Sequence, residues 1–329
     1  MALKIFPNNL SIILKNTIGS FTTSLLFDRL LSDTLVIFNY HDICDDPSPF
    51  STKYHLAVEP QLFIKQLKWI KKYFNVITPI DLLKGNYDRP AAMITFDDGF
   101  KSAFNFGAEA ITNEGLSATI FVNMAPVNGE IFWSGLVTYL CNNVPIFQKK
   151  MLKKYNVNLE NLFLYITDED VLEFKELDII NDLAETIKIF HGEFADNSDL
   201  ENSNNKNIFI GNHLYNHYNA LNISKEKLKE LYLKNSEELE KYKNSINLFS
   251  YPFGQPDTCY SEDTDKIIYS LGATHIFTAY PLVNERKDTT HLHRVSLFNS
   301  INTEEKFRYH CAIPTLVNNL IRKQKYSFV

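Results

Sequence analysis

The chain has 329 residues, of which 45% are hydrophobic and 22% are charged, and its formal net charge is −6. This composition is typical of a globular protein with a large core, and the acidic balance gives no electrostatic case for nucleic acid as a partner. The four cysteines are scattered and form no C-x-x-C pair, so neither a thiolate zinc site nor a redox pair is expected. Free thiols of this kind suit a reducing compartment.

Residues 1–33 are predicted to form an N-terminal helical segment. Apolar residues recur in it at helical spacing, at Leu10, Leu14, Ile18, Phe21 and Leu25. The favoured interpretation is a helix packed on its own domain. The alternative is a helix lying on a membrane surface, which would give a peripheral contact at the inner membrane face. The sequence shows no signal-peptide pattern, so a cytoplasmic location is expected.

Seven short apolar runs are rich in β-branched and aromatic residues, as strands buried on both faces require. They are Thr34–Tyr40, Ala91–Phe96, Ser117–Val122, Asn207–Ile210, Ile246–Ser250, Thr274–Ala279 and Leu292–Leu297. Helical patterns lie among them, at Pro60–Tyr73, Ser224–Tyr242 and Asp263–Leu271. Strands and helices in alternation predict an α/β fold with a parallel sheet, and seven strands could close into a barrel.

Residues 130–200 interrupt this alternation. The stretch begins with E-I-F-W-S-G-L-V-T-Y-L, is helical in pattern and contains no clear strand. An Asp-, Asn- and Ser-rich run follows it. We interpret residues 130–206 as a helical insertion that ends in an exposed loop, and residues 301–329 as a C-terminal helical tail.

Polar residues collect at the carboxyl ends of the predicted strands. In chain order they are His41, Asp97 with Asp98, Asn123, His213, and the turn Tyr251–Gly254. Active sites of parallel α/β folds are built at this edge of the sheet. The shared position therefore predicts one site that draws on five strands.

His213 and His217 are spaced by four residues, which would place both imidazoles on one face of a helical turn, a common zinc arrangement. A catalytic zinc typically takes three protein ligands and keeps one position for water. One carboxylate of the pair Asp97 and Asp98 would complete the ligand set, and the other would take a proton from that water. The cation would also keep both carboxylates ionised. The alternatives are a solvated turn for the histidines and an ordinary type I turn for D-D-G.

The stretch S-Y-P-F-G, Ser250–Gly254, predicts a tight turn, because Pro252 and Gly254 both favour one. Such a turn could direct the backbone N–H of Phe253 toward a developing oxyanion. The alternative is a plain loop.

Three motifs together resemble those of the polysaccharide deacetylase family, carbohydrate esterase family 4. They are T-F-D-D-G (Thr95–Gly99), I-G-N-H-L-Y-N-H (Ile210–His217) and S-Y-P-F-G (Ser250–Gly254). The stretches N-Y-H-D-I and L-G-A-T-H-I-F-T are similar to the biofilm-type and surface-polysaccharide branch. The resemblance covers about residues 34–300, which we take as the barrel domain.

This resemblance implies a distorted (β/α)7 barrel with a bound divalent metal, usually zinc. It also implies that Asp97 is the general base and that Asp98, His213 and His217 are the metal ligands. The reaction that it implies removes an N-acetyl group from an amino sugar and releases acetate.

The sequence departs from the family pattern at two positions. Leu214 stands where Ser or Thr is usual, and Ser250 stands where the family usually has an Arg that orients the base. Arg294, on the last predicted strand, is the candidate to supply that charge from elsewhere; its alternative role is to pair with a buried carboxylate.

Two histidines are candidates for the general acid. We prefer His41, because it leaves a strand on the active-site edge. His293 is the alternative, since Leu292-His293 is similar to the C-terminal L-x-H of the family. His41 could instead be a hydrogen-bonded histidine in the wall of the site.

The expected substrate is an N-acetylated glycan, or an amino sugar linked to a lipid or a nucleotide. Two other functions stay open. One is a catalytically impaired relative that only binds carbohydrate, suggested by the departures at Leu214 and Ser250. The other is a different enzyme with two histidines and a carboxylate on its metal, such as a non-haem iron oxygenase. The alternation of strands and helices argues against that class, which usually has a jelly-roll fold.

Overall fold

A computed structural model describes residues 24–157, 162, 164–175, 177, 179–286 and 290–326. The helical pattern predicted at Leu10, Leu14, Ile18 and Phe21 lies outside the described residues, and the domain boundaries at residues 33 and 300 stay a prediction. Within the described part of the chain, no helix combines the length and apolar character that a membrane span requires.

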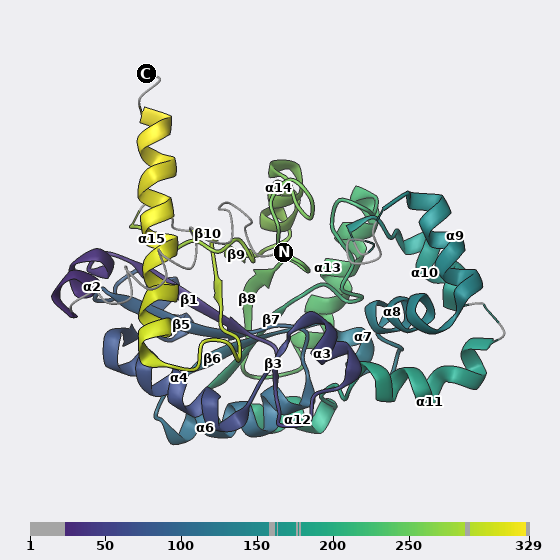
Figure 1. Ribbon diagram of the computed structural model, residues 1–329, viewed down its shortest axis with the longest axis horizontal. Helices are drawn as coiled ribbons and strands as arrows, with labels where there is room; N and C mark the ends of the chain where they lie inside the picture. Colours follow the sequence, from purple (N-terminus) through teal and green to yellow (C-terminus); the bar gives the residue numbers. More distant parts are fainter. Residues whose placement is uncertain are drawn as a thin grey trace.

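The centre of the fold is a nine-stranded parallel sheet that curls into a barrel (Figure 1). Its main path runs in the order β10-β9-β8-β7-β6-β5-β1-β11, and β4 pairs with β5. The strands are β1 (Leu35–Tyr40), β4 (Asn75–Val76), β5 (Ala91–Phe96), β6 (Ala118–Val122), β7 (Ile208–Asn212), β8 (Ser245–Ser250), β9 (His275–Phe277), β10 (His291–Leu292) and β11 (Val295–Ser296). Two further strands, β2 (Asp42–Ile43) and β3 (Ala57–Val58), pair with each other. The predicted parallel α/β fold, a distorted (β/α)7 barrel, is confirmed.

The last predicted strand, Leu292–Leu297, is divided between the two edges of the sheet. Its first part, β10, pairs with β9, and its second part, β11, pairs with β1. The Leu292 carbonyl accepts from the Thr278 N–H at 2.9 Å, and the Leu297 N–H donates to the Asn39 carbonyl at 3.1 Å. One short stretch of chain therefore joins both edges of the curled sheet, and Arg294 lies at the crossing point.

The helices cover the outside of the barrel (Figure 1). Helix α4 (Pro60–Tyr73) has the predicted bounds, and α13 (Lys225–Leu239) begins after Ser224, whose side chain caps it by accepting from the Lys227 N–H. The others are α2 (Ser24–Leu31), α3 (Pro49–Tyr54), α5 (Pro79–Lys84), the π-helix Ala103–Gly107, α6 (Ala108–Asn113), α7 (Met124–Val127), α8 (Trp133–Asn143), α9 (Pro145–Tyr155), α10 (Asp168–Lys175), α11 (Ile179–His191), α12 (Asn197–Ser203), α14 (Glu262–Ser270) and α15 (Glu304–Tyr326). Helices α8 to α12 lie between β6 and β7, where the sequence predicts a helical insertion. The exposed loop predicted at its end is wrong in part, because α12 lies there and is capped by the Asp196 side chain. Helices α8 to α11 form a group at the end of the molecule far from α15 (Figure 1).

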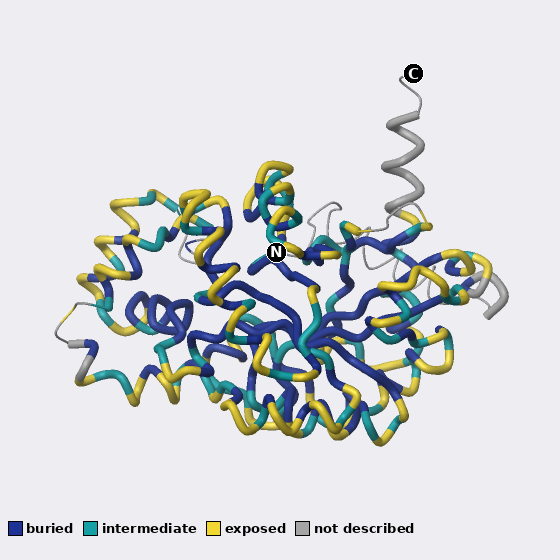
Figure 2. Tube along the Cα trace, turned by 180° about the vertical axis from the view of Figure 1, so that it is seen from behind, coloured by how far each residue is buried: buried dark blue, intermediate teal, exposed yellow. Residues whose placement is uncertain are grey.

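Strands β1, β5 and β6 are buried on both faces, and they form a continuous buried centre in Figure 2. One apolar cluster takes alternate residues from the strands and includes Leu35, Ile37, Met93, Phe121, Leu248, Phe277 and Leu292. The intervening residues, such as Val36 and Ile94, belong to a larger cluster shared with the helices. Because side chains alternate along a strand, the first cluster is the inside of the barrel. Continued toward the carboxyl ends, the same alternation places Asn39, Thr95, Asp97 and Asn123 on the inner side.

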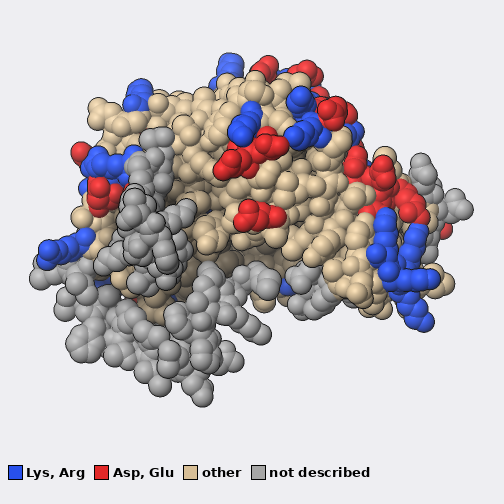
Figure 3. Space-filling model, turned by 90° about the horizontal axis from the view of Figure 1, so that it is seen from above, with Lys and Arg blue, Asp and Glu red and all other residues tan. Residues whose placement is uncertain are grey.

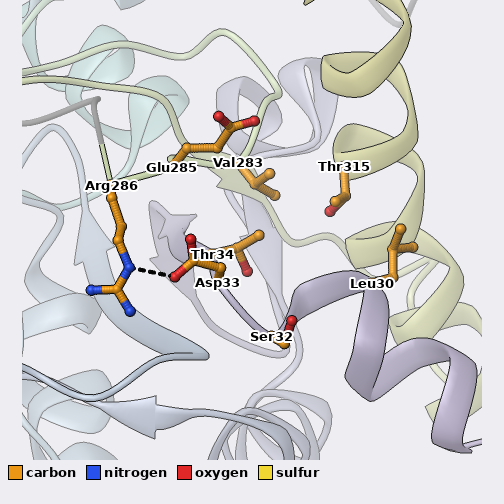
Figure 4. A pocket seen from close by; sticks show the side chains of 8 residues that line it. All are labelled: Leu30, Ser32, Asp33, Thr34, Val283, Glu285, Arg286 and Thr315. Carbon is orange, nitrogen blue, oxygen red and sulfur yellow. Dashed lines mark hydrogen bonds and ion pairs between the residues drawn. The ribbon is translucent and has the colours of Figure 1, made fainter.

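Most charged side chains lie on the surface, and Asp97, Asp98 and Arg294 are buried exceptions. On the face seen in Figure 3, the described acidic and basic residues gather in small mixed groups. A pocket of about 360 Å³ lies at the amino end of β1 and is lined by Leu30, Ser32, Asp33, Thr34, Val283, Glu285, Arg286 and Thr315 (Figure 4). Arg286 Nε donates to Asp33 Oδ1 at 2.6 Å across it. This pocket is at the opposite edge of the sheet from Asp97, so it is not the site that the motifs predict.

Phe121 tests whether the inner cluster supports the barrel. Its ring is fully buried and packs against Phe277, with the centroids 5.0 Å apart. Phe121→Ala should lower the free energy of unfolding by about 3 to 5 kcal/mol, because it removes buried surface and leaves a cavity. Urea denaturation measures this. Ile146→Ala is the control, because Ile146 is 83% exposed and should change stability by less than about 0.5 kcal/mol. Equal losses for both variants would contradict the assignment of the core.

Candidate active site

Asp97 and Asp98 follow β5 in a tight turn. The Gly99 N–H donates to the Asp97 carbonyl at 2.9 Å, and Asp98, between them, has φ of 71°. This is a three-residue turn of the strained γ type rather than the ordinary type I turn. A left-handed conformation at a residue other than glycine costs about 1–3 kcal/mol and is typical of functional sites. The two neighbouring carboxylates consequently have different partners.

Asp97 is held by Arg294 from the segment that joins the edges of the barrel. Arg294 Nη1 and Nη2 donate to the two carboxylate oxygens, each at 2.7 Å, and Asn39 Nδ2 donates to Oδ2 at 3.1 Å. Arg294 also donates to Ser250 Oγ at 2.8 Å and to the Thr278 carbonyl at 3.0 Å. Burial by itself raises the pKa of Asp97, but Arg294 and, to a smaller extent, the nearby histidines hold it below the ordinary value.

Arg294 contacts both Asp97 and Ser250, the position where the sequence lacks the expected arginine. A bidentate guanidinium orients a carboxylate in one plane and keeps it ionised. Ser250 Oγ accepts a hydrogen bond from this guanidinium. The positive charge beside Asp97 therefore comes from Arg294, 44 positions after Ser250 in the chain. The alternative considered for Arg294, pairing with a buried carboxylate, is observed, and that carboxylate is Asp97; the role of Arg294 toward a general base stays a prediction.

Asp98 faces the two histidines. Asp98 Oδ1 lies 3.4 Å from His213 Nε2 and 3.0 Å from His217 Nε2, and all three residues are buried. Burial by itself raises the pKa of Asp98, but the adjacent His217 and the hydrogen-bonding groups of His213 and His217 hold it well below the ordinary value. On the opposite side of its ring, His213 Nδ1 lies 2.8 Å from the Ser250 carbonyl. Since a carbonyl can only accept, Nδ1 carries the proton, and Nε2 is the nitrogen that faces Asp98.

This donor set fits a divalent cation. The ligand atoms of Asp98, His213 and His217 lie within 4.8 Å of one another, and they are the one such group among the described residues. Burial lowers the pKa of His217, which favours the neutral imidazole that a metal binds. Two imidazoles and one carboxylate are a common ligand set for zinc.

The segment from His213 to His217 is a loop, so the predicted helical turn is wrong. Leu214 and His217 have φ of 58° and 57°, in the left-handed region, and these two reversals bring the imidazoles together with 4.9 Å between centroids. The Leu214 N–H donates to Asn212 Oδ1 at 2.9 Å, and the Leu214 side chain is completely buried. Leu214 thus anchors the loop in the core, where the family usually has a hydroxyl.

The insertion supports His217, a role that the sequence did not reveal. Trp133 Nε1 donates to the His217 carbonyl at 3.2 Å, and the ring of Phe132 packs against the imidazole at 5.4 Å. Phe253, from the S-Y-P-F-G turn, packs against the same imidazole at 4.8 Å. The aromatic pair Phe132 and Trp133, in E-I-F-W at the start of the insertion, was the sequence feature that could have indicated this contact.

The turn at Phe253 repeats the geometry at Asp98. Phe253 has φ of 61°, and the Gly254 N–H donates to the Pro252 carbonyl at 2.7 Å. Gly254 is also left-handed, and a Cβ there would lie 2.4 Å from the backbone nitrogen of Ala279. Only glycine can occupy this position without moving the backbone at Ala279. The predicted tight turn is confirmed.

The two candidate acids have different surroundings. His41 is partly exposed at the end of β1, and its charge is among those that offset burial and lower the pKa values of Asp97 and Asp98. His293 Nδ1 lies 3.1 Å from Thr278 Oγ1, and its ring packs against Tyr280 at 5.7 Å. His41 follows Tyr40, whose carbonyl accepts from the Asp97 N–H at 3.0 Å, so it lies on the edge where the sequence predicts the acid.

A sequence model of the polysaccharide deacetylase family matches residues 84–276, more than half of the chain. The chain therefore belongs to the polysaccharide deacetylase family. This assigns it to the deacetylases, a class of hydrolases, and confirms the resemblance drawn from the three motifs. None of the curated proteins compared with the chain matched it.

Solved structures of deacetylases share the fold. IcaB from Ammonifex degensii is 16% identical with a TM-score of 0.56, and the match covers 85% of this chain and 98% of that one. The Streptococcus pyogenes deacetylase PplD, solved in complex with acetate, is 15% identical with a TM-score of 0.55, and the match covers 84% of this chain and 97% of that one. A de-N-acetylase from Aggregatibacter actinomycetemcomitans is 14% identical with a TM-score of 0.54, and the match covers 84% of this chain and 100% of that one. At these identities the likeness concerns the fold.

Arg294→Met tests the ion pair with Asp97. We expect the free energy of unfolding to fall by about 3 to 5 kcal/mol, because the change leaves a buried carboxylate without its partner. Urea denaturation of the variant and the wild type measures the loss. Adding Asp97→Asn to Arg294→Met should recover part of it, since the uncompensated charge is then removed. A double variant as unstable as the sum of the two single losses would contradict this coupling.

Proposed function

We propose that this protein is a metal-dependent hydrolase that removes the N-acetyl group from an amino sugar of a glycan or glycan precursor, releasing acetate. The observation that carries the proposal is the division of partners at the D-D-G turn. Arg294 holds Asp97 ionised, while Asp98 faces His213 and His217. One carboxylate is thereby available for proton transfer and the other for a metal.

Asp98, His213 and His217 would hold the metal, and we propose zinc. The imidazole and carboxylate donors suit this ion, and the Ser250 carbonyl fixes the His213 ring so that Nε2 faces the site. When bound, such a cation polarises the acetamide carbonyl and makes a water molecule more acidic.

The residues of the chain carry the proton transfers. Asp97 accepts a proton from the water that attacks the acetamide carbon, and Arg294 keeps this carboxylate in its ionised form. The Phe253 N–H donates to the oxygen that becomes negative in the tetrahedral intermediate. His41 gives a proton to the nitrogen as the C–N bond breaks. Water and amide are converted to acetate and a free amine, so the proposed steps balance.

The alternative functions are less well supported. A relative that only binds carbohydrate was suggested by the missing arginine at Ser250, but Arg294 supplies an equivalent charge to Asp97. A non-haem iron oxygenase would be expected on a jelly-roll fold, whereas this sheet is parallel. The substrate class that we favour is an N-acetylated glycan, with lipid- or nucleotide-linked amino sugars as the alternatives.

Variants at the D-D-G turn separate the two carboxylate roles. We expect Asp98→Ala to lose both the bound metal and acetate release. We expect Asp97→Asn to keep the metal while acetate release falls by about 10²- to 10⁴-fold, the contribution typical of a general base. Metal content is measured by mass spectrometry, and acetate is measured with chitooligosaccharides and N-acetylhexosamine conjugates as substrates.

Wild-type protein stripped of metal and reloaded with zinc is the control, and it should recover acetate release. Full metal content together with full acetate release in Asp98→Ala would contradict the proposal. A wild type that binds these sugars but releases no acetate would favour the carbohydrate-binding alternative.

A further inference from the structure

Asn123 follows β6 at the carboxyl edge of the sheet, and neither the family motifs nor the proposed steps use it. The inner cluster includes Phe121, and side chains alternate along a strand, so Asn123 also faces the inside of the barrel. Val122 is registered with Asn212 on β7, and the His213 N–H donates to the Val122 carbonyl at 3.1 Å. One residue further along this register, Asn123 lies beside His213.

The side chain of Asn123 is fully buried, and neither its Oδ1 nor its Nδ2 has a hydrogen-bond partner among the described residues. It is the one side chain in the described part of the chain with two such atoms. A buried amide without partners costs free energy, so most buried polar side chains in folded proteins are paired.

Asparagine at a helix start usually caps the helix, but here it does not. Asn123 precedes α7, yet its side chain makes no capping hydrogen bond. The N–H of Met124 instead donates to Asn235 Oδ1 at 2.9 Å. Asn235 Nδ2 also donates to the Val122 carbonyl at 2.8 Å. The backbone on both sides of Asn123 is thus fixed by Asn235, while the amide itself is left for another partner.

We propose that Asn123 is a substrate-binding residue whose carboxamide hydrogen-bonds the N-acetyl group that reacts. A carboxamide offers N–H donors and a carbonyl acceptor. An acetamide offers the complementary carbonyl acceptor and N–H donor. The position beside His213 and on the same inner side as Asp97 brings this amide to the reacting centre. The inference rests on the proposed deacetylase function and deepens it.

Asn123→Leu tests this assignment, because leucine is similar in size and has no polar atoms. Without metal or substrate, the melting temperature of the variant should rise above that of the wild type, since two unpaired polar atoms are removed from the interior. In the zinc-loaded enzyme, kcat/KM for acetate release should fall about tenfold or more, with most of the loss in KM. Inhibition by added acetate should weaken by a similar factor, and metal content should not change.

Asn244→Leu is the matched control. Asn244 is also buried, but its Nδ2 donates to Ser203 Oγ and to the Ile208 carbonyl, each at 2.8 Å, away from the carboxyl edge. This variant should lose melting temperature and keep the KM of the wild type. Asn123→Ala provides a second change at the site and should raise KM as the leucine variant does.

A lower melting temperature with unchanged KM and unchanged acetate inhibition in the Asn123 variants would overturn the inference, because that is the signature of a structural residue. The melting temperature of the metal-free protein does not depend on the reaction. A wild type that releases no acetate from any of the substrates would instead overturn the proposed function, so the two failures are distinguishable.

Discussion

The ion pair between Asp97 and Arg294 is the interaction on which the rest of the site depends. Arg294 lies between β10 and β11, in the short stretch of chain that pairs with both edges of the sheet. Its guanidinium contacts Asp97, Asn39, Ser250 and Thr278, so it binds groups from several strands at once. A buried pair of this kind is costly to desolvate and adds little net stability over an apolar pair. Its value here is to fix the position and the ionised state of Asp97.

Strained backbone conformations also help to position the residues of the site. Asp98, Leu214, His217 and Phe253 all have left-handed φ values, although none of them is glycine. Such conformations persist only where the surrounding structure imposes them. At Leu214 the buried side chain does so, and at His217 the Trp133 indole and the rings of Phe132 and Phe253 do so. The core and the start of the insertion therefore stabilise the strained backbone that positions the proposed metal ligands.

The sequence was informative wherever the determining contacts are local. Apolar runs located β1 and β5 to β9, although the short strands β2, β3 and β4 were not predicted, and the bounds of α4 were predicted at Pro60 and Tyr73. The site residues could be grouped because the carboxyl ends of parallel strands meet at one edge. The geometry of His213 and His217 was predicted wrongly, because spacing alone does not reveal the left-handed residue at Leu214. The pairing of Arg294 with Asp97 spans 197 residues, and the support of His217 by Trp133 spans 84. Contacts this distant depend on how the barrel closes, which local patterns do not specify.

The central claim is that the adjacent carboxylates have separate tasks, with Asp98 on a metal and Asp97 on Arg294. Anomalous diffraction from crystals of the zinc-loaded protein, recorded on both sides of the zinc absorption edge, tests this most directly. The account predicts one anomalous peak, within bonding distance of Asp98, His213 and His217, with Asp97 still paired to Arg294. A peak bonded to Asp97 in place of Asp98, or zinc bound away from these histidines, would contradict it.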